Sequence, residues 1–503
     1  MITISVAELC KATNGSLINN CSTQANEQHV MISSVSTDTR TMPKGALFIA
    51  LKGPSFDAHD LLPEAIKKGA VVLLVNSDRT IKLAEQPWVV EVENTRVALG
   101  LLAGYIRQKV EGLKCAAITG SNGKTTCKEL LSSILTVQCG DQDYVLSTAG
   151  NFNNDIGLPL TLLRLQTQHQ FAVVELGANH IGEIAYTSTI AKPDVALVNN
   201  VMPAHLEGFG SLEGVATAKA EIWSSLSSSG IAVVNLSANF SDQFIQTLHN
   251  NKQPILTFSN ENKVLLSRKP DLYASDVHYN QLGQSCFTLN VEPSAFSVIY
   301  LANKLQPINT CAESVTIQLN LPGKHNVNNA LAASAMALAL GCSLKSIQQG
   351  INTLQQVPGR VNSSLISNDI TVIDDTYNAN SASVNAAIDL LSQYDSEKLL
   401  ILGDMGELGQ YAEQEHQKIG LYAQKQEVDQ LFTVGNLSQL TTNAYNAASK
   451  KMIAEHFFDK EGLELAISHY LSNKKSKLVI LVKGSRSAKM EEIVTFIKTK
   501  FSK

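Results

Sequence analysis

Short apolar runs alternate with amphipathic helical stretches through the central part of this chain. The clearest runs cover 171–176, 194–199 and 231–236, and each ends in polar or glycine-containing residues. Apolar runs bounded in this way predict buried strands, and strands that alternate with helices predict a parallel sheet covered on both faces. The central part is therefore predicted to be an α/β domain with a largely parallel sheet.

The pattern differs on either side of this region. Before residue 110, short apolar strands at 47–50 and 71–75 mix with helices and turns. An irregular, strand-prone stretch runs from about 253 to 320, and an alanine-rich helix is predicted over 325–340. Residues 357–360, Val-Pro-Gly-Arg, are interpreted as a linker because proline and glycine interrupt regular structure.

The alternation of strands and helices restarts after this linker. Strands are predicted at 370–373, 398–402, 430–434 and 477–482, with helices between them. This pattern is typical of a separate domain with a nucleotide-binding type of fold. A length of 503 residues also favours about three domains. The predicted domains are 1–110, 111–356 and 357–503.

Composition limits the classes of partner. The net charge of −5, without a long basic run, argues against a nucleic-acid-binding surface. The eight cysteines have no C-x-x-C spacing, so neither a disulfide framework nor a zinc site is expected. The first ten residues lack the basic-then-apolar plan of a signal peptide, and the longest apolar stretch, 330–340, is too short to span a bilayer. We expect a cytoplasmic protein without membrane insertion.

The strongest chemical signal is the stretch 118–126, Ile-Thr-Gly-Ser-Asn-Gly-Lys-Thr-Thr. An apolar strand precedes it, and a helix follows with Leu130, Leu131, Ile134 and Leu135 on one face. Glycines there allow a tight turn in which backbone N–H groups and a helix N-terminus point at phosphate oxygens. The residues predicted to hold a nucleotide are Thr119, Gly120, Ser121, Asn122, Gly123, Lys124, Thr125 and Thr126.

Within this loop, Lys124 is expected to supply a point charge for the outer phosphates, and the Thr125 hydroxyl is expected to be a ligand for Mg²⁺. The strict eight-residue phosphate-loop pattern requires glycine where this chain has Ile118. The alternative is a surface turn that happens to precede Lys-Thr. The strand before the loop, the helix after it and the doubled threonine favour the nucleotide interpretation.

Three further residues follow strands or lie on a helix of the same domain. Glu175 follows the strand at 171–174, and His205 lies shortly after the strand at 195–198. Because functional groups gather at the carboxyl ends of parallel strands, both are candidates to serve a metal beside the phosphates. Alternatively, Glu175 caps a helix and His205 is structural. Lys219 would ordinarily be a solvated helix residue.

The order of these motifs closely resembles the Mur ligase family. The phosphate loop is followed by Glu175, His205 and Lys219, then by Gly-Lys-His-Asn-Val-Asn-Asn at 323–329, and then by Pro-Gly-Arg at 358–360. The family shares the departure from the strict loop at Ile118. Other motifs resemble the dipeptide-adding branch, and they occupy 148–159, 374–380 and 56–60. Ser381 stands where many relatives have proline, and 253–320 matches no motif of the family.

The resemblance implies an ATP-dependent amide ligase that adds D-alanyl-D-alanine to UDP-N-acetylmuramoyl-tripeptide through an acyl phosphate. It implies an N-terminal UDP-binding α/β domain, a central P-loop ATPase-like domain with a parallel sheet, and a C-terminal Rossmann-like α/β domain that closes over ATP and binds the dipeptide. The implied catalytic residues are Lys124, Glu175, His205, Lys219 and Arg360.

The resemblance also implies ATP and two Mg²⁺ ions as cofactors. Thr125 and Glu175 would hold one ion, and the other would lie near His205 and Lys219. In related ligases the equivalent lysine is carbamylated, which turns an amine into an oxygen donor suited to magnesium. Such a reaction needs an amine whose pKa is lowered, as burial and neighbouring cations favour. The alternative is an unmodified Lys219 that contacts phosphate or substrate.

Further assignments follow from the same resemblance. Asn326 and Asn329 would bind adenine, although helix capping is the plain alternative, and Arg360 would reach the ATP phosphates. The further residues expected on the nucleotide side are Asp375, Tyr377 and Asn378. The residues expected to bind the UDP-muramoyl substrate or the peptides are Thr37, Asp38, Thr39, Arg40, Asn151, Asn153, Asn154 and Arg486. A surface salt bridge is the alternative for Arg40, and the loops at 403–409 and 483–486 are either peptide-facing or purely structural.

Three other functions compete with this one. The nearest is another ligase of the superfamily, such as the tripeptide-forming enzyme or a folylpolyglutamate synthase. The second is a P-loop phosphotransferase or nucleotide switch, and the third is a catalytically silent nucleotide-binding module. We favour the dipeptide-adding ligase, acting as a monomer on small-molecule substrates.

Overall fold

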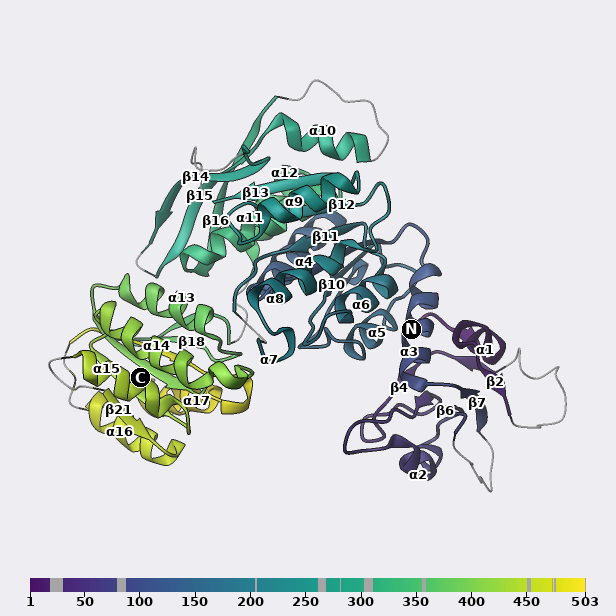
Figure 1. The fold of residues 1–503 in the computed structure, drawn as a ribbon, viewed down its shortest axis with the longest axis horizontal. Helices are drawn as coiled ribbons and strands as arrows, with labels where there is room; N and C mark the ends of the chain where they lie inside the picture. The colour runs from purple at the N-terminus through teal and green to yellow at the C-terminus, as the bar shows by residue number, and fades with distance from the viewer. Residues whose placement is uncertain are drawn as a thin grey trace. The chain divides into compact units, whose positions relative to one another are not determined.

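A computed structural model describes the chain in two compact units (Figure 1). The first unit comprises residues 1–117, 141–178 and 183–194, and the second comprises 118–140, 179–182 and 195–503. The residues described are 1–18, 30–78, 87–203, 206–260, 268–280, 282–302, 311–354, 359–449, 454–472, 474 and 476–502. Within these ranges, no helix is both long enough and apolar enough to cross a membrane.

A five-stranded sheet forms the N-terminal part of the first unit. Its order is β2-β7-β6-β5-β4, and β4 to β7 run parallel while β2 is antiparallel to β7. The strands are β2 (Ser16–Leu17), β4 (Val35–Ser36), β5 (Leu47–Ile49), β6 (Val72–Asn76) and β7 (Trp88–Val92). The strands predicted at 47–50 and 71–75 are thereby confirmed as β5 and β6.

Helices and a small strand pair complete this part. The pair joins β1 (Ile4–Ser5) to β3 (Met31–Ile32), and the helices are η2 (Ala58–Leu61), α1 (Val6–Thr13), α2 (Leu62–Lys67) and α3 (Thr95–Gln108). Asn94 caps α3, because its side chain accepts hydrogen bonds from the Arg96 and Val97 amides. The cap fixes where α3 begins after β7.

The rest of the first unit holds strands in the order β8-β10-β9, with helices α5 and α6. These elements are β8 (Lys114–Thr119), β9 (Val145–Ser147), β10 (Phe171–Glu175), α5 (Gly157–Leu162) and α6 (Glu183–Ala191). Helix α3 packs closely on α6, since a Cβ at Gly100 would lie 2.3 Å from the Tyr186 hydroxyl. Strand β8 continues into the second unit at residue 118.

In the second unit the strand order is β16-β15-β14-β13-β12-β11-β8. The strands are β11 (Val195–Val198), β12 (Ile231–Asn235), β13 (Ile255–Ser259), β14 (Leu272–Tyr279), β15 (Gln284–Val291) and β16 (Glu313–Pro322). Strands β11 to β14 pair in parallel, whereas β14, β15 and β16 pair antiparallel.

The antiparallel extension and helix α10 (Pro293–Ala302) occupy the strand-prone stretch 253–320 (Figure 1). Neither feature is predicted by the sequence pattern, which indicated a largely parallel sheet. In β15 the residues alternate between buried and partly exposed positions, as expected for a strand with one face on the core. The prediction of a largely parallel sheet is confirmed, and among the described residues the antiparallel pairings of this sheet are confined to β14, β15 and β16.

Helices α4 (Lys124–Cys139) and α11 (Lys324–Ala339) pack on each other in this unit. Leu130, Leu131, Ile134 and Leu135 are fully buried along α4, which confirms the predicted apolar face. Helix α11 confirms the helix predicted over 325–340. The other helices here are α7 (Leu206–Phe209), α8 (Leu212–Ala220), η4 (Glu221–Trp223), α9 (Ser241–Asn250) and α12 (Leu344–Thr353).

The C-terminal part of the second unit is a six-stranded sheet in the order β17-β18-β22-β19-β20-β21. Only β17 is antiparallel to its neighbour among these paired strands. The strands are β17 (Asn362–Ser367), β18 (Ile370–Asp375), β19 (Glu397–Gly403), β20 (Gln430–Val434), β21 (Ala454–Phe457) and β22 (Leu478–Lys483). Four of the six, β18, β19, β20 and β22, were predicted from the sequence.

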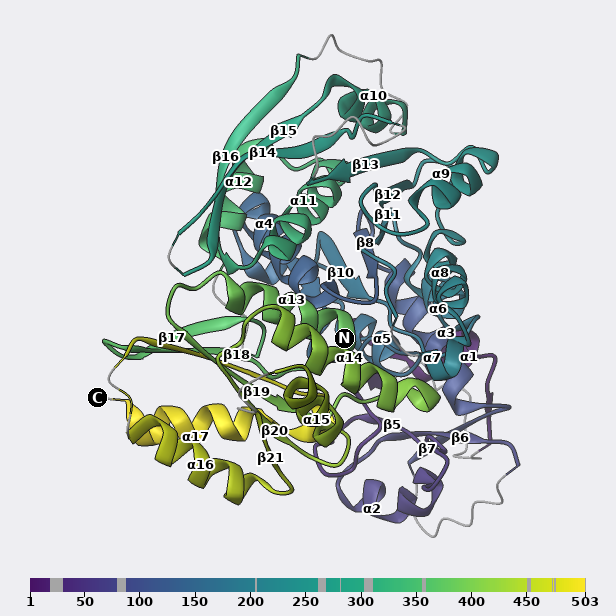
Figure 2. The same cartoon turned by 60° about the vertical axis from the view of Figure 1, so that its left-hand side comes forward.

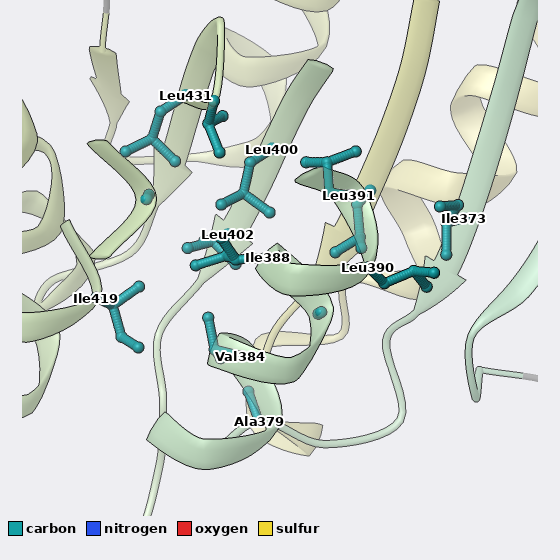
Figure 3. Close-up of a cluster of buried hydrophobic side chains, with 14 of the residues drawn as sticks. Ile373, Ala379, Val384, Ile388, Leu390, Leu391, Leu400, Leu402, Ile419 and Leu431 are labelled. Carbon is teal, nitrogen blue, oxygen red and sulfur yellow. The ribbon is translucent and has the colours of Figure 1, made fainter. Parts of the chain in front are cut away.

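Two layers of helices cover this sheet. Leu400 and Leu402 of β19 point to the cluster that contains Val384 and Ile388, as Figure 3 shows, while Leu399 and Ile401 belong to the opposite cluster. This alternation follows from the two-residue period of a strand. Helices α16 and α17 lie on one side of the sheet and α13 on the other (Figure 2). The helices are α13 (Ser381–Ser392), α14 (Ala412–Lys425), α15 (Ser438–Ala448), α16 (Lys460–Ser472) and α17 (Glu491–Phe501).

Candidate nucleotide site

The loop between β8 and α4 turns sharply at Gly123. This glycine has φ +79° and precedes the first helical residue, Lys124. Among the residues that the structure describes, no side chain caps the N-terminus of α4, so the first amides of this helix lack a side-chain acceptor there. The Lys124 ammonium donates a hydrogen bond to the Gly120 carbonyl, 2.6 Å away. An uncapped helix N-terminus beside a lysine is suited to phosphate oxygens.

We predict that Gly123→Ala abolishes tight binding of an ATP analogue. A Cβ at this position would lie 2.4 Å from Asn329 Oδ1 and 2.6 Å from Asn199 Nδ2, in addition to the unfavourable positive φ. Gly140→Ala is the matched control, because Gly140 ends the same helix at φ +82° with open space around its Cβ. Calorimetric titration should show normal affinity in the control, and normal affinity in Gly123→Ala would contradict this role of the turn.

The segment after β11 holds the phosphate loop in place. The Asn122 carbonyl accepts hydrogen bonds from the side-chain amides of Asn199 and Asn200, each at 3.0 Å. Asn200 Oδ1 accepts from the Asn122 amide at 2.9 Å, and Ser121 Oγ bonds with the backbone of Met202. The sequence analysis assigned no role to Asn199 and Asn200. Their position directly after a buried strand could have indicated that they lie near the site.

A chain of buried side-chain amides lies beneath the loop. Asn199 Nδ2 donates to Asn329 Oδ1 at 3.0 Å, Asn329 Nδ2 donates to Asn326 Oδ1 at 2.9 Å, and Asn326 Nδ2 donates to the Pro322 carbonyl at 2.7 Å. The structure thus places Asn326 and Asn329 beneath the phosphate loop, a contact that was not predicted for them. Their contacts brace the loop from α11, and adenine binding by these two residues stays a prediction.

Arg360 reaches the same loop from the C-terminal part of the unit. Its Nη2 donates to Thr125 Oγ1 at 2.9 Å, and its guanidinium lies 4.0 Å from the centre of the Tyr377 ring. The side-chain amides of Asn380 and Asn122 bond to each other, with Asn380 Nδ2 2.8 Å from Asn122 Oδ1. These contacts bring the predicted residues Arg360 and Tyr377 to the phosphate loop.

Lys219 is buried in the last turn of α8, with a relative exposure of 3%. Burial lowers the pKa of Lys219 well below its ordinary value, and the positive charge of Lys124 lowers it further. A lysine in this environment holds more neutral amine near pH 7 than a surface lysine does. It is therefore suited to react as a nucleophile.

Glu175 ends strand β10 in the first unit and is 1% exposed. Its backbone amide donates to Thr148 Oγ1 at 3.0 Å, whereas its buried side-chain Oε1 has no hydrogen-bond partner among the described residues. Asn153 lies against the same turn, because the Gly177 amide donates to the Asn153 carbonyl at 2.8 Å. A buried carboxylate oxygen without a partner is the kind of group that a cation would satisfy.

The remaining predicted residues in these regions are exposed, make local contacts, or lie outside the described ranges. His205 lies outside the residues that the structure describes. Asn151 is exposed, and Asn154 Oδ1 accepts a hydrogen bond from the Gly157 amide at the start of α5. Asn378 accepts a hydrogen bond from the Ala379 amide through its own Oδ1. Arg486 pairs with Glu491 at 3.0 Å.

The segment after β4 forms a surface turn. Arg40 makes a two-pronged ion pair with Asp38, in which Nη2 lies 2.7 Å from Oδ2, and the Arg40 side chain is 85% exposed. The hydrogen bonds from Arg40 hold the pKa of Asp38 at about 2. Thr39 is buried in the same turn, and Thr37 is half-buried. The salt bridge considered for Arg40 is thus present, while diphosphate binding stays a prediction.

Several buried polar atoms around the loop fit a nucleotide with its metal. Within the ranges that the structure describes, three buried atoms have no hydrogen-bond partner: Thr119 Oγ1, Asn199 Oδ1 and Arg360 Nε. In the part of the chain that the structure describes, no group of three or more histidine, cysteine, aspartate or glutamate side chains could hold a metal.

The fold and this loop define a phosphate-loop α/β protein. Residues 31–107, 118–337 and 359–486 match, respectively, the models of the Mur ligase family catalytic domain, the Mur ligase middle domain, and the Mur ligase glutamate ligase domain. The chain belongs to the Mur ligase family.

Individual relatives match over almost the whole chain. The UDP-N-acetylmuramoyl-tripeptide--D-alanyl-D-alanine ligase of Escherichia coli (strain K12) is 39% identical over 494 residues, which cover 98% of each chain. A crystal structure of MurF from Acinetobacter baumannii has a TM-score of 0.85 and 33% identity, and 99% of each chain is covered. The MurF ligase of Thermotoga maritima in complex with ADP has a TM-score of 0.75 and 25% identity, covering 93% of this chain and 97% of that chain.

Proposed function

We propose that this chain is an ATP-dependent ligase that joins D-alanyl-D-alanine to UDP-N-acetylmuramoyl-tripeptide. The products are the UDP-N-acetylmuramoyl-pentapeptide precursor of peptidoglycan, ADP and phosphate. The observation that carries the proposal is the 39% identity to a ligase of that name over 98% of both chains. The phosphate loop, with Lys124 and Arg360 beside it, supports the use of ATP, as does the ADP complex of the Thermotoga maritima relative.

The formation of an acyl phosphate explains why positively charged side chains are needed at this site. A carboxylate is a poor electrophile, so its oxygen first attacks the γ-phosphorus of ATP, which forms an acyl phosphate and releases ADP. The dipeptide amine then attacks the acyl carbon, and the tetrahedral intermediate expels phosphate. Two anions must approach each other in the first step, and Lys124 and Arg360 offset that repulsion.

Magnesium would complete this charge balance. We assign Thr125 and Glu175 to one Mg²⁺. His205 and a carbamylated Lys219 would hold a second. Thr125, Glu175 and the carbamate would bind through oxygen atoms, which magnesium prefers. When bound, these ions neutralise phosphate charge and orient the carboxylate and phosphate for in-line transfer. The burial of Lys219, which lowers its pKa, supports the carbamate, because only an unprotonated amine adds CO₂.

The domain assignment is part of the proposal. Residues 1–110 would bind the UDP-muramoyl end through Thr37, Asp38, Thr39 and Arg40, helped by Asn151, Asn153 and Asn154 of the domain at 111–356. Residues 357–503 would bind the dipeptide, with Arg486 near it. We propose further that the chain acts in the cytoplasm as a monomer.

Phosphate release tests the proposal directly. With ATP, Mg²⁺ and UDP-N-acetylmuramoyl-tripeptide, release should depend on added D-alanyl-D-alanine and should match pentapeptide formed by mass spectrometry. Glutamate with a folate acceptor, and a UDP-dipeptide with the third amino acid, are the comparison pairs. Faster turnover with either pair would favour another ligase of the superfamily, and release without any amine would favour a phosphotransferase.

A further inference from the structure

A buried lysine lies at the carboxyl end of a strand in the C-terminal sheet. Lys483 is the last residue of β22 and lies opposite Asp375, the last residue of the neighbouring parallel strand β18. Its side chain is 2% exposed, and its Nζ lies 2.6 Å from Asp375 Oδ2 and 2.9 Å from the Asn378 carbonyl. One ammonium group thus holds both ends of the four-residue segment 375–378.

The buried Lys483 ammonium restricts the position of the segment 375–378. A buried charge must be paired and hydrogen-bonded, and removal of its partners leaves a desolvated ion. The segment between Asp375 and Asn378 therefore cannot shift away from β22 without leaving the Lys483 ammonium unsatisfied.

This segment supports the contact with the phosphate loop. The Tyr377 amide donates to the Gly359 carbonyl at 3.0 Å, and the Tyr377 ring lies under the Arg360 guanidinium. Arg360 in turn donates to Thr125 Oγ1. A continuous path of contacts therefore runs from Lys483 through Tyr377 and Arg360 to Thr125.

We propose that Lys483 is a positioning residue for ATP binding, which holds the segment 375–378 so that Tyr377 sets Arg360 against the phosphate loop. The inference rests on the proposed function only in taking ATP as the nucleotide. It gives Lys483 a task on the nucleotide side of the site, distinct from the peptide-facing role expected for residues 483–486.

Lys483→Met in the full chain tests this inference. Misplacement of Arg360 should weaken Mg²⁺–AMP-PNP binding by about 10- to 100-fold in calorimetry. Hydrogen exchange of the Tyr377 amide should become faster in the nucleotide-free protein, because its bond to Gly359 is no longer held. Lys398→Met is the matched control, since Lys398 is also mostly buried and ion-paired, with Asp429, but lies near the amino end of β19. The control should leave both readouts unchanged.

A double-variant cycle separates positioning from general stability. If Lys483 acts through Arg360, then adding Lys483→Met to Arg360→Ala should change the AMP-PNP dissociation constant by less than about threefold. Multiplicative losses, or unchanged affinity in a folded Lys483→Met, would overturn the inference. If that variant does not fold, Lys483→Gln is judged by the same criteria. Phosphate release independent of D-alanyl-D-alanine, alongside the expected AMP-PNP results, would remove the proposed ligase function but leave this inference standing.

Discussion

Lys124→Met should lower kcat for dipeptide-dependent phosphate release by about 10²–10³-fold. The Lys124 ammonium lies at the start of α4 and within 2.6 Å of the Gly120 carbonyl, so its charge is held inside the loop. In the variant, the negative charge on the phosphoryl group that passes from ATP to the carboxylate would no longer be balanced by the cation of the loop. Methionine keeps most of the side-chain length while removing the charge. Steady-state phosphate release at saturating substrates measures the effect.

Lys345→Met is the control for this substitution. Lys345 is exposed on α12 and its removal changes the net charge equally. Because an exposed charge distant from a reaction is screened by salt, this control should keep its full rate. A Lys124→Met enzyme that retains more than about a tenth of the wild-type kcat would contradict the place given to Lys124.

Lys219→Ala should lower activity by about 10²-fold or more, and short carboxylic acids should restore part of it. The reason is that a carbamate is an anionic oxygen donor, which acetate or formate can replace in the space left by the side chain. The assay compares phosphate release by Lys219→Ala with and without each acid at constant ionic strength.

Lys124→Ala serves as the internal control for rescue, since a carboxylate cannot replace a cation. Absence of any recovery in Lys219→Ala, or equal recovery in both variants, would count against the carbamate. An independent check is the carbonyl resonance of a carbamate in wild-type enzyme supplied with ¹³C-bicarbonate, which Lys219→Ala should lack.

The pH dependence of this modification has a definite sign. Burial lowers the pKa of Lys219, so the neutral amine persists to lower pH than it would in a surface lysine. As the pH falls, the ammonium form grows and cannot add CO₂. The carbamate signal should therefore decline on the acidic side and recover when the pH is raised.

Much of the fold was accessible from the sequence because buried parallel strands are short continuous apolar runs. Strands β10, β11 and β12 and helices α4 and α11 lie where those patterns placed them. Helix α10 was missed because its residues, Pro293–Ala302, follow a β-rich stretch and carry no clear polar face. The antiparallel pairing of β14, β15 and β16 was missed because local periodicity indicates that a strand forms but does not specify which strand it pairs with or in which direction.

Part of the candidate site could be predicted because some residues belong to a sequence motif with a known chemical role. The phosphate loop is recognisable by residue type and spacing, whereas Arg360 was expected only from the resemblance to the Mur ligase family. The structure places Arg360 Nη2 2.9 Å from Thr125 Oγ1 of this loop. Asn199, Asn200 and Lys483 were not assigned to the nucleotide site, because their roles arise from strand ends that become neighbours only in the folded sheets. Ser381, in place of the proline of many relatives, begins α13 after the Asn380 cap, and a residue at that position needs no intrahelical donor.

We expect ATP to activate the substrate acid as an acyl phosphate before the amine attacks. Transfer of ¹⁸O from the tripeptide carboxylate tests it most directly, because the oxygen that attacks the γ-phosphorus must leave with the phosphate. With UDP-N-acetylmuramoyl-tripeptide labelled in its terminal carboxylate, one ¹⁸O should appear in each phosphate released as D-alanyl-D-alanine is consumed. Phosphate free of ¹⁸O, with pentapeptide still formed, would contradict the account.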